Sequence, residues 1–190
     1  ATSLFWVADN VSSASTLYNG SGAPLALVVS MPFGDSPTGV VFNNSGNFNG
    51  DLFVFATENG TIDGWRGALG TTAETLFSSS GSDVTGLALG TSVSGTYLYA
   101  ADFKNGSITV FPSTGAPAIP GTFTDPTLPA GYAPFNIQDI GGQLFVTYAR
   151  VGAGGEAGTG AGEGFVDVFD LNGNFVERLV SQGALNAPWG

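Results

Sequence analysis

Residues 51–66 read DLFVFATENGTIDGWR, an apolar run, an Asn-Gly pair and a second run closed by Trp and Arg. Residues 98–111 repeat the pattern as LYAADFKNGSITVF. An Asn-Gly pair tolerates the positive φ angles of a tight turn, so each stretch predicts a β-hairpin, turning at Asn59-Gly60 and Asn105-Gly106. The hairpin is therefore the element from which the rest of the chain can be interpreted.

Similar apolar runs begin at Leu4 (LFWVADN), Leu52, Leu98 and Leu144 (LFVTYA), in steps of 48, 46 and 46 residues. Each run is rich in aromatic and β-branched residues and is followed by a second run, as strands of a sheet require. A further short run precedes three of the hairpins, at Thr38, Thr85 and Ala133, and we call the strand upstream of a hairpin its inner strand. Runs that follow the hairpins predict outer strands at residues 25–30, 73–79, 118–123 (AIPGTF) and 175–181.

Four short strands in each step of about 46 residues are typical of a β-propeller blade. The sequence predicts an all-β protein with about four blades of four antiparallel strands in one domain of 190 residues. A β-sandwich or a β-solenoid is the alternative, but neither explains a regular unit with its own internal order. The blade-like units are expected at residues 1–32, 37–80, 84–125 and 132–183, with residues 184–190 as a terminal inner strand.

The two ends of the chain look complementary. The first hairpin has no inner strand before it, whereas the last residues, NAPWG, resemble the beginning of the inner strand APFN. Pairing between the ends would close a ring in one copy or join copies head to tail. A third interpretation is a piece of a longer propeller, cut inside a blade at each end. The residues predicted to serve ring closure or assembly are Leu4, Phe5, Trp6, Ala187, Pro188, Trp189 and Gly190.

Charge and composition exclude several classes of function. Four Lys and Arg against fifteen Asp and Glu give a net charge of −11, which opposes binding to nucleic acid or to an anionic membrane. The sequence has no Cys and no His, so it lacks disulfides, thiolate metal sites and Ser-His-Asp or Cys-His catalytic sets. Low charge with abundant Gly, Ser, Thr and Asn suits an exported protein, and no apolar run is long enough to span a membrane. A secreted, extracellular location is therefore expected.

Acid-base chemistry would have to use carboxylates, and paired carboxylates would have to face one cleft. The carboxylates considered are Asp35, Asp51, Glu58, Asp63, Asp102, Asp139, Glu156, Glu163, Asp167 and Asp170. Asp9, Glu58 and Asp102 end equivalent strands in successive units, so they are expected on one rim, as turn residues or as a ligand site. Trp65, at the end of an outer strand, is expected to be the more exposed tryptophan and a candidate ligand contact, while the other aromatics fill the core.

Asp170, Asn172 and Asn174 place oxygen atoms at alternate positions, as calcium loops do, but the EF-hand order is not met. An outer hairpin turn explains them as well, so no cofactor is predicted and calcium has no support. The glycine-rich stretch VGAGGEAGTGAGEG, residues 151–164, is expected to be a flexible surface loop.

The chain also resembles a known family along most of its length. The carrying segments are FWVADN, GDLFVFATENGTIDGW, FTDPTLPAGYAPFNIQDIGGQLFVTYA and the final NAPWG. They are similar to exported bacterial β-propeller proteins of unassigned function, marked by FTDPxLPxGYAPFNIQ and NxPWG motifs, some with a C-terminal sorting signal. The resemblance implies a secreted propeller, generally longer than this chain, and supplies no catalytic residues. In that family an NPWG-type inner strand commonly precedes FWVADN, and here it occurs only at the C-terminus.

Blades without a recognisable catalytic set predict a non-enzymatic extracellular module for structure or protein interaction, self-associating through its terminal strands. A carbohydrate-binding or carbohydrate-cleaving propeller that uses channel carboxylates and aromatics is the alternative. The expected partners are a second copy, an extracellular protein or a glycan.

Overall fold

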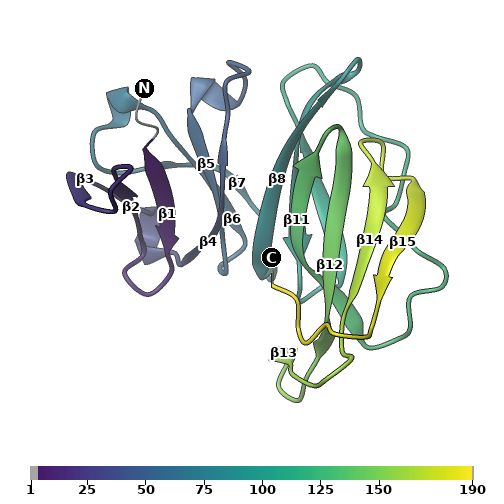
Figure 1. Ribbon diagram of the computed structural model, residues 1–190. Coiled ribbons are helices and arrows are strands. Elements are labelled where there is room, and N and C mark those ends of the chain that lie inside the picture. The colour runs from purple at the N-terminus through teal and green to yellow at the C-terminus, as the bar shows by residue number, and fades with distance from the viewer. Residues whose placement is uncertain (1–3, 190) are drawn as a thin grey trace. The chain divides into compact units, whose positions relative to one another are not determined.

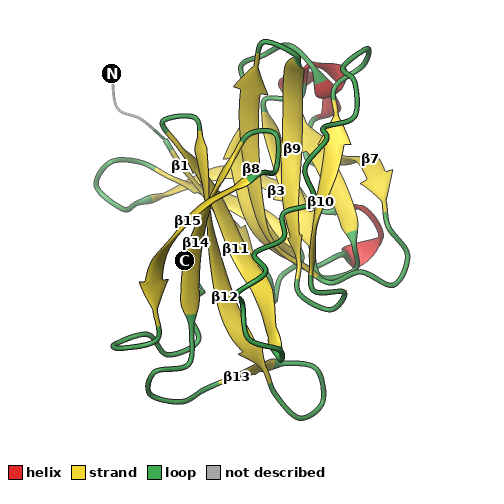
Figure 2. Cartoon of the chain, turned by 90° about the vertical axis from the view of Figure 1, so that its right-hand side faces the viewer, coloured by secondary structure: helices red, strands yellow, loops and turns green. Residues whose placement is uncertain are grey.

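The structure, a computed structural model, describes residues 4–189 (Figure 1). Strands dominate it, and the only helices in this part of the chain are three short 3₁₀ helices (Figure 2), at Pro32–Gly34, Phe48–Gly50 and Gly67–Leu69. The strands form four antiparallel sheets, none of which closes on itself within the described residues. The predicted all-β class is confirmed, whereas open sheets by themselves do not establish a four-bladed propeller. The chain divides into two compact units, Ala1–Val84 and Thr85–Gly190.

The first unit holds two sheets, each made from consecutive strands. Asn59-Gly60 turns the hairpin of the second sheet as predicted, with Gly60 at φ +79°. A Cβ at Gly60 would also lie 2.3 Å from the carbonyl oxygen of Ser79, so both space and backbone require glycine. One sheet contains β1 (Phe5–Asp9), β2 (Ala14–Tyr18) and β3 (Pro24–Ser30), and the other contains β4 (Pro37–Phe42), β5 (Phe53–Thr57), β6 (Thr61–Trp65) and β7 (Glu74–Ser78).

The second unit likewise holds two sheets. Its first sheet begins with β8 at Val84, the last residue of the first unit. Gly106, at φ +66°, forms the turn between β9 and β10 that the second Asn-Gly pair predicts. One sheet contains β8 (Val84–Ser92), β9 (Gly95–Asp102) and β10 (Ser107–Pro112), and the other contains β11 (Tyr132–Ile140), β12 (Gln143–Val151), β13 (Ala157–Gly158), β14 (Phe165–Asp170) and β15 (Phe175–Ser181).

A hydrogen bond of the same kind recurs at each inner strand, β4, β8 and β11. Thr38 Oγ1 of β4 donates to the carbonyl oxygen of Val84 at 2.6 Å, and Thr85 Oγ1 of β8 donates to that of Phe135 at 2.5 Å. Asn136 Nδ2 of β11 donates to the carbonyl oxygen of Trp189 at 2.8 Å. Donor and acceptor are 46, 50 and 53 residues apart in the three bonds. Trp189 is therefore the acceptor equivalent to Val84 and Phe135, each of which lies in an inner strand.

The predicted fourth strand at residues 118–123 is wrong. The segment forms no strand; the amides of Gly121 and Phe123 donate to carbonyl oxygens of Asn172 and Gly173, in the β14–β15 turn. Phe123 packs in the core of the second unit instead. Pro117 and Pro120 lack the backbone N–H donors that an added strand needs. The carbonyl oxygen of Pro117 instead accepts a hydrogen bond from Tyr97 Oη.

The end of the chain departs from one further expectation. Residues 184–189 form no strand; Asn186 makes one isolated bridge, to Glu163. The glycine-rich stretch is mostly loop, as predicted, but it contains the two-residue strand β13 and holds this segment, since Ala187 N donates to the carbonyl oxygen of Glu163 and Gly160 N donates to Asn186 Oδ1. Backbone hydrogen bonds, which composition does not reveal, order the stretch.

Candidate functional site

An open aromatic groove lies between the two sheets of the first unit. Trp6 of β1 stacks on Phe53 of β5, with ring centroids 3.8 Å apart and planes at 20°, and its ring lies 5.0 Å from that of Trp65. Phe42 of β4, 58% exposed, packs against Phe53 at 5.4 Å. The groove has a volume of about 570 Å³ and is lined by Leu4, Trp6, Leu17, Leu27, Phe42, Phe53 and Trp65.

Side chains along β1 alternate between the two faces of the sheet, and this alternation places Trp6 in the groove. Trp6 points to the second sheet, whereas Phe5 and Val7 point away from it and are 58% and 43% exposed. β1 pairs only with β2 among the described strands, so its other edge is unpaired there. An edge strand with exposed apolar side chains is a ready template for pairing with another chain.

Trp65 belongs to this groove, but its predicted exposure is wrong. The side chain is 8% exposed, and Nε1 donates to the carbonyl oxygen of Gly70 at 2.9 Å. Trp6, which comes from a different sheet, covers its ring. Position at the end of a strand therefore did not reveal the burial, because the covering residue is distant in sequence.

Of the predicted rim residues, Asp9 and Glu58 lie in the first unit and Asp102 lies in the second. Asn10 Nδ2, next to Asp9, donates to Glu58 Oε1 at 2.9 Å, so two of the turns meet. Asp102 is 2% exposed and accepts hydrogen bonds from the amide and side chain of Asn105, at 3.1 and 2.7 Å. Its carboxylate thus serves its own turn, and a shared ligand site for the three residues stays a prediction.

The predicted assembly residues have distinct environments. Trp189 is 60% exposed, yet its ring stacks on Phe135 at 5.4 Å with planes at 12°. Ala187 is buried with Phe103, Ala133 and Ala149. Pro188 lies against Gly164, where an added Cβ would meet its ring at 2.5 Å. Leu4, Phe5 and Trp6 lie at the groove and its edge, and Gly190 lies outside the described residues.

The first unit also buries two acidic clusters beside the groove strands. Thr61 Oγ1 lies 3.0 Å from Asp35 Oδ2 and 3.2 Å from Asp63 Oδ2. Burial raises the pKa of Asp63 to about 6, against the hydroxyls of Thr75 and Thr61, which lower it, and the neighbouring Asp35 adds to the rise. Close carboxylates in a shared hydroxyl network can hold a proton, and both of these side chains are buried.

The second acidic cluster contains Arg66, the only Lys or Arg among residues 4–84. Arg66 Nη1 donates to Asp51 Oδ1 at 2.8 Å and to Glu74 Oε1 at 2.5 Å. Burial raises the pKa of Asp51 although Arg66 acts against it, and the hydrogen bonds from Arg66 and Asn49 lower the pKa of Glu74. This arrangement neutralises a buried carboxylate, as a structural ion pair does.

The second unit contains a polar cleft of about 390 Å³, lined by Ser107, Thr122, Thr124, Asp125, Tyr132, Tyr148 and neighbouring residues. Behind it Arg178 bonds both Asp125 and Asp167, with Nε 2.8 Å from Asp167 Oδ1. Burial raises the pKa of Asp167, which Arg178 opposes, and burial also raises the pKa of the Tyr148 phenol. Both carboxylate side chains are fully buried and Tyr148 is 4% exposed, so the accessible surface combines hydroxyl groups, the half-buried Tyr132 and apolar side chains such as Pro129.

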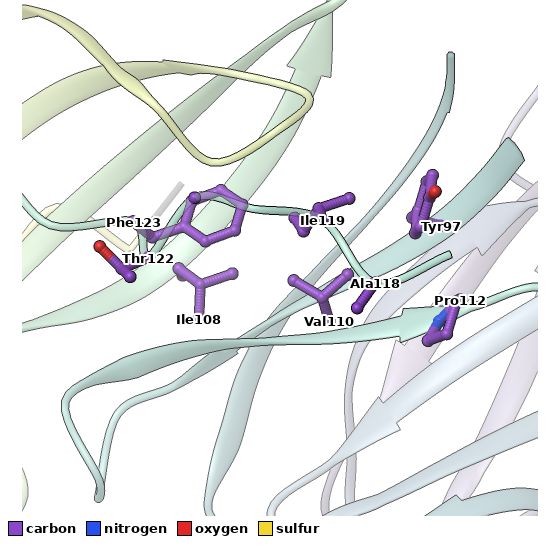
Figure 3. A pocket seen from close by; sticks show the side chains of 9 residues that line it. Tyr97, Ile108, Val110, Pro112, Ala118, Ile119, Thr122 and Phe123 are labelled. Atoms are coloured by element: carbon purple, nitrogen blue, oxygen red, sulfur yellow. The ribbon is translucent and has the colours of Figure 1, made fainter. Parts of the chain in front are cut away.

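A smaller cavity of about 210 Å³ marks where the fourth strand of the third sheet was expected. Ile108 and Val110 of β10 point toward Ile119 and Phe123 of the segment that replaces that strand (Figure 3). The lining is mostly aliphatic, with Tyr97 at one end, and it carries no group for catalysis.

The residues that were compared with a calcium loop form a turn. Asp170 Oδ1 accepts hydrogen bonds from the amides of Asn172 and Asn174, at 2.8 and 2.9 Å, and Asn174 Nδ2 donates to Oδ2. Although burial acts to raise the pKa of Asp170, these hydrogen bonds lower it. Residues 4–189 contain no cluster of three or more Asp or Glu suited to a metal.

No helix in the described range is long and apolar enough to cross a membrane.

Comparison with known proteins gives viral relatives. The chain is similar to an uncharacterized protein of Acanthamoeba polyphaga mimivirus, 37% identical over 171 residues, covering 80% of this chain and 42% of the relative. A second uncharacterized protein of that virus is 30% identical over 207 residues, covering 97% of this chain and 54% of the relative. The chain thus spans about half the length of the relatives it matches.

No family model matches the chain. The resemblance to an exported bacterial family, based on the FTDPxLPxGYAPFNIQ and NxPWG strings, is therefore wrong, because the relatives found are viral. Short strings rich in Gly, Pro and aromatic residues follow the turn and core chemistry of β-sheets, so they were a weak guide to source.

Proposed function

We propose that the chain is a non-enzymatic interaction module of β-propeller type that binds an extended apolar segment at the aromatic groove. The observation that carries the proposal is the groove itself, which combines stacked aromatic rings with an edge of β1 that pairs with no other strand among residues 4–189. Backbone pairing at an edge supplies affinity, and pockets for side chains supply specificity.

The propeller part of the proposal is supported by the repeated link from each inner strand to a residue one step later. Thr38, Thr85 and Asn136 each donate to a backbone carbonyl at the next step of the chain. When sheets are arranged radially, the same contact is expected to recur from one sheet to the next. Two sheets packed face to face would not require such a recurrence. An extracellular location remains a prediction from composition.

The test uses peptides copied from the inner strands of this chain, TGVVFN and APFNIQ. Isothermal titration calorimetry should show binding with a negative heat-capacity change, because apolar surface is buried. Phe42→Ser should abolish binding, since Phe42 lines the groove. Phe33→Ser is the matched control, because Phe33 is 94% exposed and outside the groove. Absence of heat with either peptide, or equal binding by both variants, would overturn the proposal.

The polar cleft of the second unit favours a second candidate, carbohydrate binding. The half-buried ring of Tyr132 offers a face for a pyranose, and the exposed Ser107, Thr122 and Thr124 offer hydroxyl groups. A glycan array with the Tyr132→Ala variant as control addresses this candidate, and unchanged binding by that variant would place any glycan elsewhere.

A further inference from the structure

The polar cleft and the smaller aliphatic cavity of the second unit adjoin one another. Ile108, Thr122 and Phe123 line both of them. In the smaller cavity these three residues lie at one end, and Tyr97 and Pro112 lie at the other (Figure 3). A single ligand can therefore reach from the hydroxyl groups of the cleft into the aliphatic cavity.

Tyr148, which lines the cleft, differs from the other buried tyrosines of this unit. Tyr97 Oη donates to the carbonyl oxygen of Pro117 at 2.9 Å, and Tyr99 Oη donates to that of Leu171 at 2.8 Å. Tyr148 is 4% exposed, yet its phenol makes no hydrogen bond within residues 4–189. Because a buried phenol usually has a hydrogen-bond partner, we expect the partner of Tyr148 to come from a ligand in the cleft.

The charges around the two spaces favour a neutral ligand. Among residues 4–189, Asp125 is the only charged residue in the two linings. Its Oδ1 accepts hydrogen bonds from the amide and the hydroxyl of Thr127, at 2.7 and 2.8 Å, and its Oδ2 is paired with Arg178. Arg178 also bonds Asp167, so the carboxylate and the guanidinium are already engaged within the protein.

We propose that the cleft and the cavity together bind a glycoside with an apolar aglycone, the sugar in the cleft and the aglycone in the cavity. This inference rests on the second candidate function, carbohydrate binding, and adds the apolar half of the ligand. Tyr132 and Tyr148 face the sugar, whereas Val110 and Ile119 face the aglycone. A cavity of about 150 Å³ holds benzene, so a cavity of about 210 Å³ has room for a phenyl group.

Methyl and phenyl β-glucosides, with the matching pair of β-galactosides, separate the two halves of the site. In an NMR titration, the phenyl glycoside of at least one pair should bind about tenfold tighter than its methyl partner, because the phenyl ring leaves water for the aliphatic cavity. Val110→Phe should remove this difference and leave binding of the methyl glycoside unchanged, since Val110 lines the cavity but not the cleft.

The buried tyrosines provide a matched pair of variants for the cleft. Tyr148→Phe should weaken binding of both glycosides about tenfold and leave the melting temperature unchanged, because the phenol has no partner inside the described protein. Tyr99→Phe makes the same substitution at a buried position outside both linings. It should lower the melting temperature, since the carbonyl oxygen of Leu171 loses its donor, and leave the affinity unchanged.

The outcomes distinguish this inference from the functions on which it builds. Equal affinity for methyl and phenyl glycosides, phenyl binding that survives Val110→Phe, or equal effects of the two tyrosine variants on affinity would overturn the inference and leave carbohydrate binding standing. Absence of binding by all four glycosides would overturn both the inference and the carbohydrate candidate. Peptide binding at the aromatic groove is a separate measurement, and none of these results changes it.

Discussion

Two fully buried aspartates show how the same residue can be held by different neighbours. Asp63 in β6 and Asp167 in β14 each lie in the third strand of a sheet path, and neither is accessible to solvent. Asp167 has Arg178 as a hydrogen-bonded cation, whereas Asp63 has hydroxyl groups and a second carboxylate, Asp35. The free-energy penalty of burying a carboxylate is therefore offset by a cation at Asp167 but not at Asp63.

This difference predicts how stability depends on pH. The pKa of Asp63 rises from 3.8 in the unfolded chain to about 6 in the folded protein. A raised carboxyl pKa favours folding fully below pH 3.8, and that contribution is lost as pH rises to about 6. The two values differ by about two pH units, so the loss is about 3 kcal/mol.

Asp63→Asn removes this titration. Urea unfolding of the first unit should show a free energy that falls between pH 4 and pH 7 in the original chain, and a flatter profile in the variant. Equal slopes for the two proteins would contradict the assignment to Asp63.

At the scale of the element, the sequence predicted strands well and their neighbours poorly. Periodicity and Asn-Gly pairs located the hairpins because both signals are local. The strand predicted at residues 118–123 failed because Asn172 and Gly173, about fifty residues later, bind that segment instead. The groove was not predicted: Trp65 was singled out as a ligand contact and Trp6 as an assembly residue, and their mutual contact depends on how two sheets pack.

The C-terminal segment offers a test of one such distant contact. Asn136→Asp keeps the side-chain oxygen that accepts from the amide of Ile137, but it replaces the donor to Trp189 by a carboxylate. We expect faster hydrogen exchange at the amide of Ala187, which bonds Glu163, because the segment is released.

Asn19→Asp is the control for this variant. The side chain of Asn19 accepts hydrogen bonds through Oδ1 from Ser21 and Ala23, a role that aspartate also performs. Protection at Ala187 that survives Asn136→Asp would show that the stack on Phe135 and the bridge to Glu163 suffice to hold the segment.

At the scale of the whole molecule, charge limits association. Each copy carries a net charge of −11, so copies repel one another at low ionic strength. The peptides TGVVFN and APFNIQ, with capped ends, carry no charged groups, so added salt should leave their affinity for the groove unchanged, because screening acts on charges while apolar contacts persist. Isothermal titration calorimetry across a sodium chloride series measures the effect. An affinity that falls steeply with salt would show that electrostatic contacts, and not the apolar groove, hold the peptide.

The series of hydrogen bonds from Thr38, Thr85 and Asn136 has a consequence for how such a chain changes length. Each bond joins one repeat of about 50 residues to the next. An inserted copy of a whole repeat therefore brings both a donor and an acceptor with it. Duplication of a coding segment for one step then leaves the neighbouring junctions satisfied, whereas duplication of half a step interrupts them. An architecture of this kind grows by modules, which makes it a natural starting point for engineering longer scaffolds.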